Sequence, residues 1–206
     1  RTCCGCREDL PPPLSGPLCG DCLLLLKPRR KAPASRGLAW VRAAEAAYAY
    51  RAPVPALLHA FKYEGRTSVG AALAGWMAGL WPGRERLGDC DALVPVPLYP
   101  ARERARGFNQ ALILARAVGR SARAPVLEAL LRTRGGVPQA RSPRGERSGK
   151  LRGAFRIKDG VPVEGLRLVL IDDVLTSGET LEACARELLT AGAEDVRAFV
   201  LAQAAI

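Results

Sequence analysis

Residues 166–183 constrain the fold of this 206-residue chain more than any other segment. They contain the apolar run Leu168-Val169-Leu170-Ile171, which is typical of a strand buried on both faces, as in a parallel sheet. Asp172 and Asp173 follow, and we expect them at the point where this strand leaves the sheet. After a short turn, apolar residues recur at helical spacing. The segment therefore predicts a strand–loop–helix unit of an α/β protein.

The turn between this strand and helix has the composition of an anion-binding site. It reads Thr176-Ser177-Gly178-Glu179-Thr180, and a helix start of this kind presents free backbone N–H groups that can hold a phosphate. The two carboxylates beside it suit ribose hydroxyls or a Mg²⁺ ion, which prefers oxygen ligands. The alternative is an ordinary capped helix with solvated acids. Two adjacent acids directly before such a turn favour the ligand site.

This segment resembles the phosphoribosyl-pyrophosphate (PRPP) signature of type I phosphoribosyltransferases. By that resemblance, Asp172 and Asp173 would face the ribose hydroxyls of PRPP. The loop that would cradle the 5′-phosphate consists of Thr176, Ser177, Gly178, Glu179 and Thr180.

The rest of the chain alternates between strand-like and helix-like patterns. We expect strands at 92–97, 153–157 and 196–201, and helices at 54–63, 68–80, 111–120 and 126–134. Residues 39–51 are ambiguous, and we favour a strand there. Such alternation predicts an open, mostly parallel sheet with flanking helices and a ligand at the carboxyl ends of the strands.

Five of the seven cysteines lie within the first 22 residues. Cys3 and Cys6 form one hook, and Cys19 and Cys22 form a second hook 12 residues later, a spacing that suits one tetrahedral, structural Zn²⁺. Two disulfides are the alternative, but we find no signal peptide and expect a cytoplasmic protein, in which disulfides are disfavoured. We therefore predict a zinc module and linker at 1–37 and a main domain at 38–206.

The net charge of +11 is concentrated in one part of the chain. Residues 102–156 carry 14 Arg or Lys against three acids. Arg102, Arg104 and Arg106 alternate in a predicted loop after the strand at 92–97, where they would meet pyrophosphate or another polyanion such as nucleic acid. The alternative is a set of solvated basic faces.

Three further features have two interpretations each. Phe61, Lys62 and Tyr63 with Arg66 would form a basic, aromatic platform for bases, or, as we favour, two core aromatics with solvated cations. His59, the only histidine, is expected to be a surface or partly packed helix residue rather than a metal ligand. The polar, basic stretch 138–152 is expected to be a mobile loop that closes over PRPP, or one that is ordered only by nucleic acid or by nothing.

Four blocks together resemble the ComF family, and the resemblance spans residues 3–203. They are Phe61-Lys62-Tyr63-x-Gly65-Arg66, Val94-Pro95-Val96-Pro97, the segment from Arg102 to Gln110 with its Gly-Phe-Asn-Gln end, and the Asp172-Asp173 motif. ComF proteins are amidophosphoribosyltransferase-like, carry an N-terminal zinc module and are linked to DNA uptake during natural competence. The resemblance implies a PRPP site with Mg²⁺, and single-stranded DNA and a competence helicase as partners.

The same residues leave three functions open. The chain is a DNA-uptake protein with a PRPP-type site, a working phosphoribosyltransferase with an unknown acceptor, or a PRPP-sensing regulator. We recognise no hood for an acceptor base, so ligand binding is predicted and turnover is not. No apolar run of 18 residues or more is present, and membrane insertion is not expected.

Overall fold

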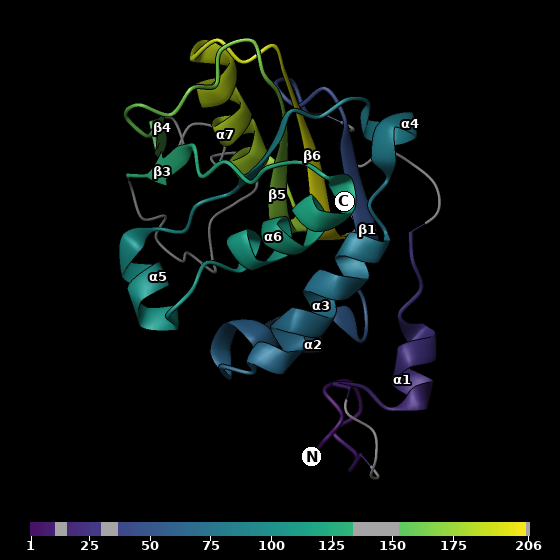
Figure 1. The fold of residues 1–206 in the computed structure, drawn as a ribbon. Coiled ribbons are helices and arrows are strands. Elements are labelled where there is room, and N and C mark those ends of the chain that lie inside the picture. Colours follow the sequence, from purple (N-terminus) through teal and green to yellow (C-terminus); the bar gives the residue numbers. More distant parts are fainter. Residues whose placement is uncertain (11–15, 30–36, 134–152, 205–206) are drawn as a thin grey trace.

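The computed structural model describes residues 1–10, 16–29, 37–133 and 153–204. Its centre is a four-stranded sheet in the order β1-β6-β5-β2, in which every neighbouring pair is parallel (Figure 1). The strands are β1 (Ala44–Ala49), β2 (Ala92–Pro95), β5 (Arg167–Leu175) and β6 (Asp195–Gln203). This architecture confirms the predicted open, parallel α/β fold.

The central strand β5 is apolar on both sides because helices cover both faces of the sheet. Leu168, Val169, Leu170 and Ile171 are all at most 1% exposed. Their side chains alternate between two core clusters, with Val169 and Ile171 in one and Leu168 and Leu170 in the other. A strand buried on both faces produces the continuous apolar run seen in the sequence.

Different elements cover the two faces. Helices α3 (Thr67–Gly79) and α6 (Gln110–Ala122) share a cluster with Val169 and Ile171. Helix α7 (Glu179–Thr190) shares the other with Leu168 and Leu170, together with a separate two-stranded hairpin of β3 (Leu130–Arg132) and β4 (Phe155–Ile157). The sheet is thus a layer between α3 and α6 on one side and α7 with the hairpin on the other.

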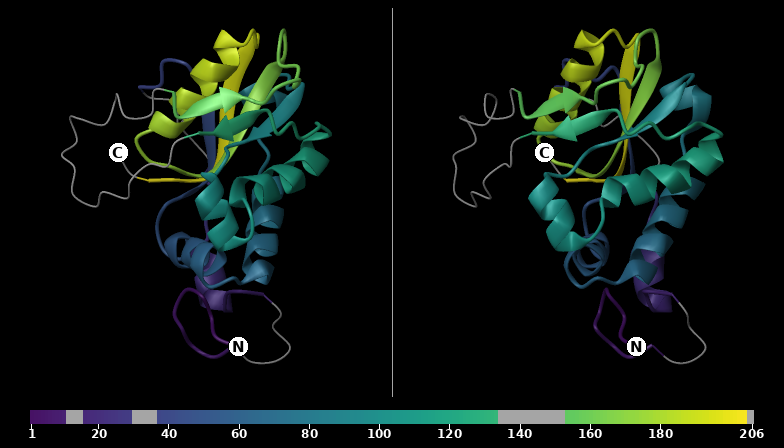
Figure 2. Two further views of the ribbon diagram at one scale, coloured as in Figure 1. Left: turned by 90° about the vertical axis from the view of Figure 1, so that its left-hand side faces the viewer. Right: turned by 60° about the vertical axis from the view of Figure 1, so that its left-hand side comes forward.

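The N-terminal segment lies beyond the carboxyl ends of the central strands. Helix α2 (Val54–Tyr63) packs on α3, and below both lie the first residues of the chain and α1 (Gly20–Leu25), as the two views in Figure 2 show. Cys3, Cys4, Leu18 and Cys22 belong to the same apolar cluster as α2 and α3. The boundary at residue 37 stays a prediction, and the core itself is continuous across it.

Two predicted elements are wrong. The arginine block is not a loop, because Pro100–Arg106 forms helix α5, which begins with Pro100 in its first turn and ends at Gly107 with φ +82°. Residues 126–134 contain no helix within their described part, since Leu130–Arg132 pairs with Phe155–Ile157 as β3. Strand pairing across a long connection overrides local helix propensity there.

Strand β5 also extends further than its apolar run. Asp172, Val174 and Leu175 pair with Val200, Ala202 and Gln203 of β6, so the two acids lie within the strand rather than past its end. The remaining helix, α4, spans Gly83–Leu87. No helix in the described residues is both long and apolar enough to cross a bilayer.

Candidate functional site

The two adjacent acids of β5 point to opposite faces of the sheet, as neighbours in a strand do. Asp173 is 5% exposed and forms an ion pair with Lys62 from the last turn of α2. Asp172 lies on the α7 side, where Arg132 and Cys184 are close enough to act on its charge. One Asp172 oxygen also accepts a hydrogen bond from the Asp173 N–H at 2.8 Å. Each acid therefore has its own environment.

The charged form of Asp172 is disfavoured in this structure. Burial, and after it the negative charge of Asp173, raises the pKa of the Asp172 carboxyl well above its usual range, although the Asp173 N–H and the Lys62 ammonium oppose the rise. A cation or a hydroxyl donor beside Asp172 would relieve this unfavourable charge. Perturbed acids of this kind are concentrated at functional sites.

The predicted phosphate loop forms the N-terminus of α7. Thr176 and Ser177 are exposed, and Gly178 is the N-cap residue of a 12-residue helix with φ +83°. A Cβ atom at Gly178 would lie 2.4 Å from Leu38 Cδ2, so both the backbone conformation and the packing require glycine. Glycine has no capping side chain, which leaves the first N–H groups of α7 available to a ligand.

Acids in the first turn of α7 do not block this position. The Glu182 carboxylate is already engaged, because it accepts hydrogen bonds from the backbone N–H groups of Ala39, Trp40 and Val41 at 3.0–3.2 Å. Glu179 and Thr180 are half-buried at the start of the helix. Residues 176–180 thus form the turn and the first residues of α7, and they follow the acid pair in the chain.

The last turn of α2 joins three of the sequence blocks. Phe61 stacks on Phe108 with ring centroids 5.0 Å apart, and the Arg106 guanidinium lies 5.4 Å from the centroid of the Tyr63 ring. Lys62, between them, contacts Asp173. Three consecutive side chains therefore connect α2 to the arginine block and to the acid pair.

These contacts correct the interpretation of the aromatic segment. Phe61 is buried as predicted, but Tyr63 is 70% exposed and is not a core residue. Lys62 is not a solvated cation, because its side chain is 19% exposed and pairs with Asp173. His59 lies on the surface, one of the two predicted positions, with Nδ1 3.2 Å from Glu64 Oε1.

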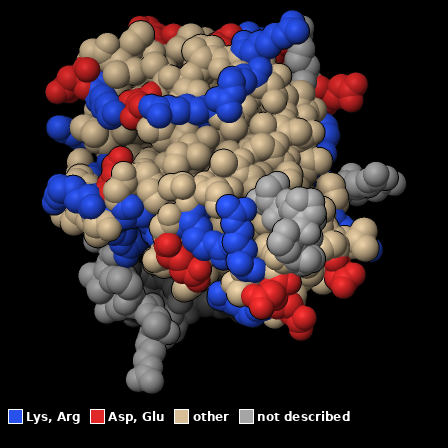
Figure 3. Space-filling model, turned by 60° about the horizontal axis from the view of Figure 1, so that its bottom comes forward, with Lys and Arg blue, Asp and Glu red and all other residues tan. Residues whose placement is uncertain are grey.

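The three arginines of α5 do not share one face. Residues 102 and 106 are one helical turn apart, whereas Arg104 lies on a different side of the helix. Arg102 and Arg104 are exposed, and Arg106 is half-buried beside Tyr63. On the face in Figure 3, basic side chains are dispersed among acids and uncharged surface rather than gathered in one patch.

Sequence reasoning missed Arg132 of β3. Its guanidinium lies over the Phe155 ring at 5.2 Å. Burial, and after it the positive charge of Arg102, lowers the pKa of Arg132, whereas the negative charge of Asp172 raises it. Arg132 also lines a pocket of about 90 Å³ with Asn109 and Lys158. The only signal in the sequence was its place in the basic half of the chain. The predicted closing loop at 138–152 lies outside the described residues.

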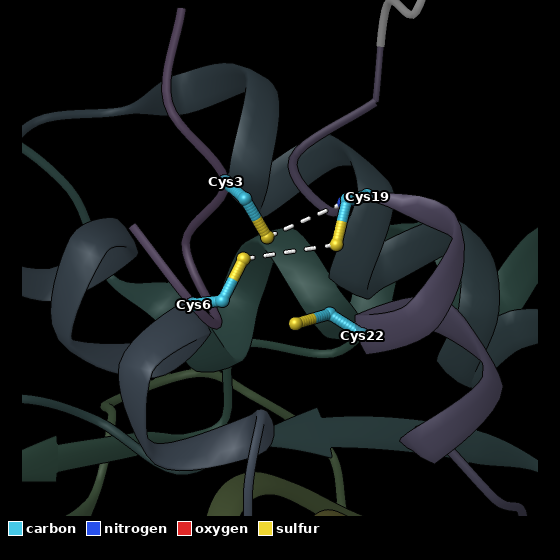
Figure 4. Close-up of side chains that lie close together, drawn as sticks. All are labelled: Cys3, Cys6, Cys19 and Cys22. Carbon is cyan, nitrogen blue, oxygen red and sulfur yellow. Dashed lines mark hydrogen bonds between the residues drawn. The ribbon is translucent and has the colours of Figure 1, made fainter. Parts of the chain in front are cut away.

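The two cysteine hooks form one cluster. The sulfur atoms of Cys3, Cys6, Cys19 and Cys22 all lie within 4.8 Å of one another and could hold a metal ion (Figure 4). Cys6 and Cys19 sulfurs are 3.7 Å apart, far beyond a disulfide bond, and all seven cysteines are free. Cys4 is buried and is not a member of the cluster.

The cluster favours a cation on electrostatic grounds. Burial raises the pKa of Cys3, but hydrogen bonds to its sulfur outweigh this effect and lower the pKa to about 6. The strongest of these hydrogen bonds is donated by the Cys19 N–H at 3.3 Å. Burial and the adjacent Cys19 side chain raise the pKa of Cys22 to about 12. Four thiolates at this spacing repel one another, and a divalent cation removes that repulsion.

Comparisons with known proteins point to one family. A family model described as "Phosphoribosyl transferase domain" matches residues 134–205. DNA utilization protein YhgH of Escherichia coli K12 is 33% identical over 156 residues, which cover 74% of this chain and 68% of that protein. Competence protein ComFC of Bacillus subtilis is 37% identical over 110 residues, which cover 53% of this chain and 43% of that protein.

Among solved structures, a glutamine PRPP amidotransferase from B. subtilis matches 65% of this chain and 26% of its own, with 22% identity and a TM-score of 0.44. The relatives, rather than this superposition, establish the family. Since the alignment to YhgH extends over two thirds of both proteins, the chain belongs to the ComF family of phosphoribosyltransferase-like proteins.

Proposed function

We propose that this protein binds PRPP or a related phosphoribosyl ligand and acts in DNA uptake during natural transformation. The ligand proposal rests on one observation, the glycine-capped start of α7 shortly after the half-buried Asp172 and the buried Asp173 of β5. The name of the competence relative supports the role in transformation.

In this proposal, different residues of the site contact different parts of the ligand. The 5′-phosphate would accept hydrogen bonds from the N–H groups of residues 176–180, and the ribose hydroxyls would donate to Asp172 and Asp173. Arg132, whose charge is influenced by both Asp172 and Arg102, would contact the pyrophosphate together with Arg102. Asp172 would also face Mg²⁺, which neutralises pyrophosphate charge when it is bound with PRPP.

A thermal-shift titration tests the ligand. Binding to the native state alone raises its stability by about 2.7 kcal/mol at a ligand concentration 100 times the Kd, which is a rise in Tm of several degrees for a chain of this size. Asp172→Asn should abolish the rise without lowering the Tm of the free protein, because asparagine removes a disfavoured charge. Asp159→Asn, at an exposed turn, is the matched control. A Tm that PRPP with Mg²⁺ leaves unchanged would exclude the proposal.

The same preparation separates binding from turnover. We propose binding as the primary activity, and an active phosphoribosyltransferase or a PRPP sensor as the alternatives. Steady release of pyrophosphate from PRPP with candidate acceptors would establish an enzyme. Tight binding without release would favour a scaffold or sensor.

Single-stranded DNA is proposed to contact the exposed Tyr63 ring. Arg106 lies against this ring, and base stacking on aromatic residues contributes about 1–3 kcal/mol per base. Tyr63→Ala should weaken binding of an oligothymidine at low salt, whereas Tyr50→Ala, another exposed tyrosine, should not. Equal losses in both variants would exclude this contact. A competence helicase is the proposed protein partner.

We propose that the cysteine cluster holds structural zinc in a module at residues 1–37. The phosphoribosyltransferase-like domain would span residues 38–206, and the protein would be located in the cytoplasm. All four sulfurs converge on one point, so no ligand position stays open for catalysis. Metal analysis of protein purified without chelator checks the identity of the ion.

A further inference from the structure

The pairing of Lys62 with Asp173 has a consequence for how the site selects its ligand. Asp173 carries one of the two carboxylates proposed to bind the ribose, yet its Oδ2 atom is buried and contacts the Lys62 ammonium. Both side chains are largely removed from water, at 19% exposed for Lys62 and 7% for Asp173. An unpaired carboxylate at this depth would be strongly destabilising.

Lys62 lies in a different part of the chain from the segment that contains Asp173. It lies more than 100 residues before Asp173, outside the region that matches the phosphoribosyl transferase domain. Its position depends on α2, whose last turn is held on either side by the Phe61–Phe108 stack and the Tyr63–Arg106 contact. These contacts anchor the turn of α2 from which the Lys62 side chain reaches Asp173 of β5.

We infer that Lys62 is a positioning residue for sugar recognition. Its ammonium holds one oxygen of Asp173 and so orients the other toward the ribose hydroxyls. Without Lys62, the carboxylate would have no cation among the contacts that the described residues provide, and its orientation would be lost. The phosphate cradle at 176–180 lies on the α7 side and needs neither residue.

This inference rests on the proposed phosphoribosyl site and predicts a separation of two affinities. In Lys62→Met, the affinity for ribose 5-phosphate should fall about tenfold or more, because the hydrogen bonds from the sugar to a charged carboxylate would be misaligned. The affinity for inorganic phosphate, which contacts only the cradle, should not change. Lys62→Arg should retain much of the preference for the sugar phosphate. Neither probe carries a pyrophosphate, so both can be titrated by calorimetry without added Mg²⁺ and without a chelator that would attack the cysteine cluster.

A structural ion pair alone would give another result. If Lys62 only stabilises the fold, Lys62→Met lowers the Tm but keeps the wild-type ratio of the two affinities, and the inference is overturned. The double variant Lys62→Met, Asp173→Asn should be no worse than Asp173→Asn alone, because Lys62 acts through that acid. Additive losses would also overturn it.

The proposed function fails in a different way from this inference. If the wild-type protein binds neither ribose 5-phosphate nor PRPP, the phosphoribosyl site itself is wrong. If the wild type binds ribose 5-phosphate and Lys62→Met binds it equally well, only the role of Lys62 is wrong. Should Lys62→Met fail to fold, Lys62→Arg and Asp173→Asn still test whether the sugar preference depends on this pair.

Discussion

The cysteine cluster and the acid site at the carboxyl edge are built in different ways. All four cysteines come from the first 22 residues, and two short hooks bring them together. The acid site draws on elements far apart in the chain, with Lys62 from α2, Arg132 from β3 and the acids from β5. A local site can be recognised from spacing, whereas a site assembled by the fold is only partly visible in its central motif.

The two regions also differ in how their charges are satisfied. The cysteine sulfurs have one another and a few backbone N–H groups as neighbours, so we expect them to depend on a cation. Asp173 already has a cation from within the protein. The cysteine cluster should therefore be sensitive to chelators, and the acid site should keep its shape without metal.

The largest expected effect is on the cysteine cluster. Cys6 is exposed, so a loss of stability in Cys6→Ser reports the metal rather than lost packing. We expect unfolding free energy to fall by about 3 kcal/mol or more, given the strength of structural zinc sites. Denaturant unfolding with and without chelator measures it, and Cys90→Ser, outside the cluster, is the control. If chelator changes the unfolding free energy of both variants equally, the cysteine cluster does not differ from the acid site in its dependence on metal.

Gly178→Ala should have the next largest effect. The new Cβ would meet Leu38 Cδ2 at 2.4 Å in a backbone conformation that alanine rarely adopts. We expect about 1–3 kcal/mol of destabilisation together with loss of phosphate binding. Gly75→Ala is the matched control because nothing lies within 4 Å of that position in α3, where alanine should stabilise the helix slightly. Thermal unfolding of both variants gives the comparison.

Arg132→Met should change ligand preference with little change in stability. If its guanidinium contacts the pyrophosphate, the affinity for PRPP falls about tenfold while the affinity for ribose 5-phosphate is unchanged. Arg156→Met, exposed on the partner strand β4, should affect neither. Parallel titrations of the two ligands decide this, and a uniform loss would instead indicate a structural role for Arg132.

The smallest effect concerns the amino end of β5, away from both regions. A side-chain hydrogen bond from Arg167 lowers the pKa of Asp91 to about 2, from an ordinary value of 3.8. A carboxyl whose folded pKa is depressed contributes stability above its unfolded pKa and loses it as the pH falls through its folded pKa. The loss should therefore occur between about pH 4 and pH 2.

Because this ion pair is about one-third exposed, its contribution should be about 1 kcal/mol or less. Asp91→Asn should flatten the pH dependence of unfolding in that range. An unchanged slope would show that other carboxyls dominate acid unfolding.

The predictions from sequence succeeded where a pattern is local. The parallel sheet follows from apolar runs such as 168–171, and the convergence of the cysteines follows from two short hooks. The prediction of a loop failed at Pro100–Arg106, although the proline at the start and the glycine at the end are signals of a helix. The prediction of a helix failed at Leu130–Arg132, which becomes a strand only because a segment beyond residue 152 pairs with it.

Sequence alone determined the spacing of the two cysteine hooks, the glycine turn before a helix and the presence of two adjacent acids after an apolar run. Each depends on residues within about 20 positions of one another, for which backbone geometry leaves few arrangements. Only the tertiary structure decided that the acids face opposite sides of β5, that Lys62 neutralises Asp173 and that Arg132 approaches Asp172. These pairings arise because packing α2 and the hairpin against the sheet brings together charges that no local spacing relates.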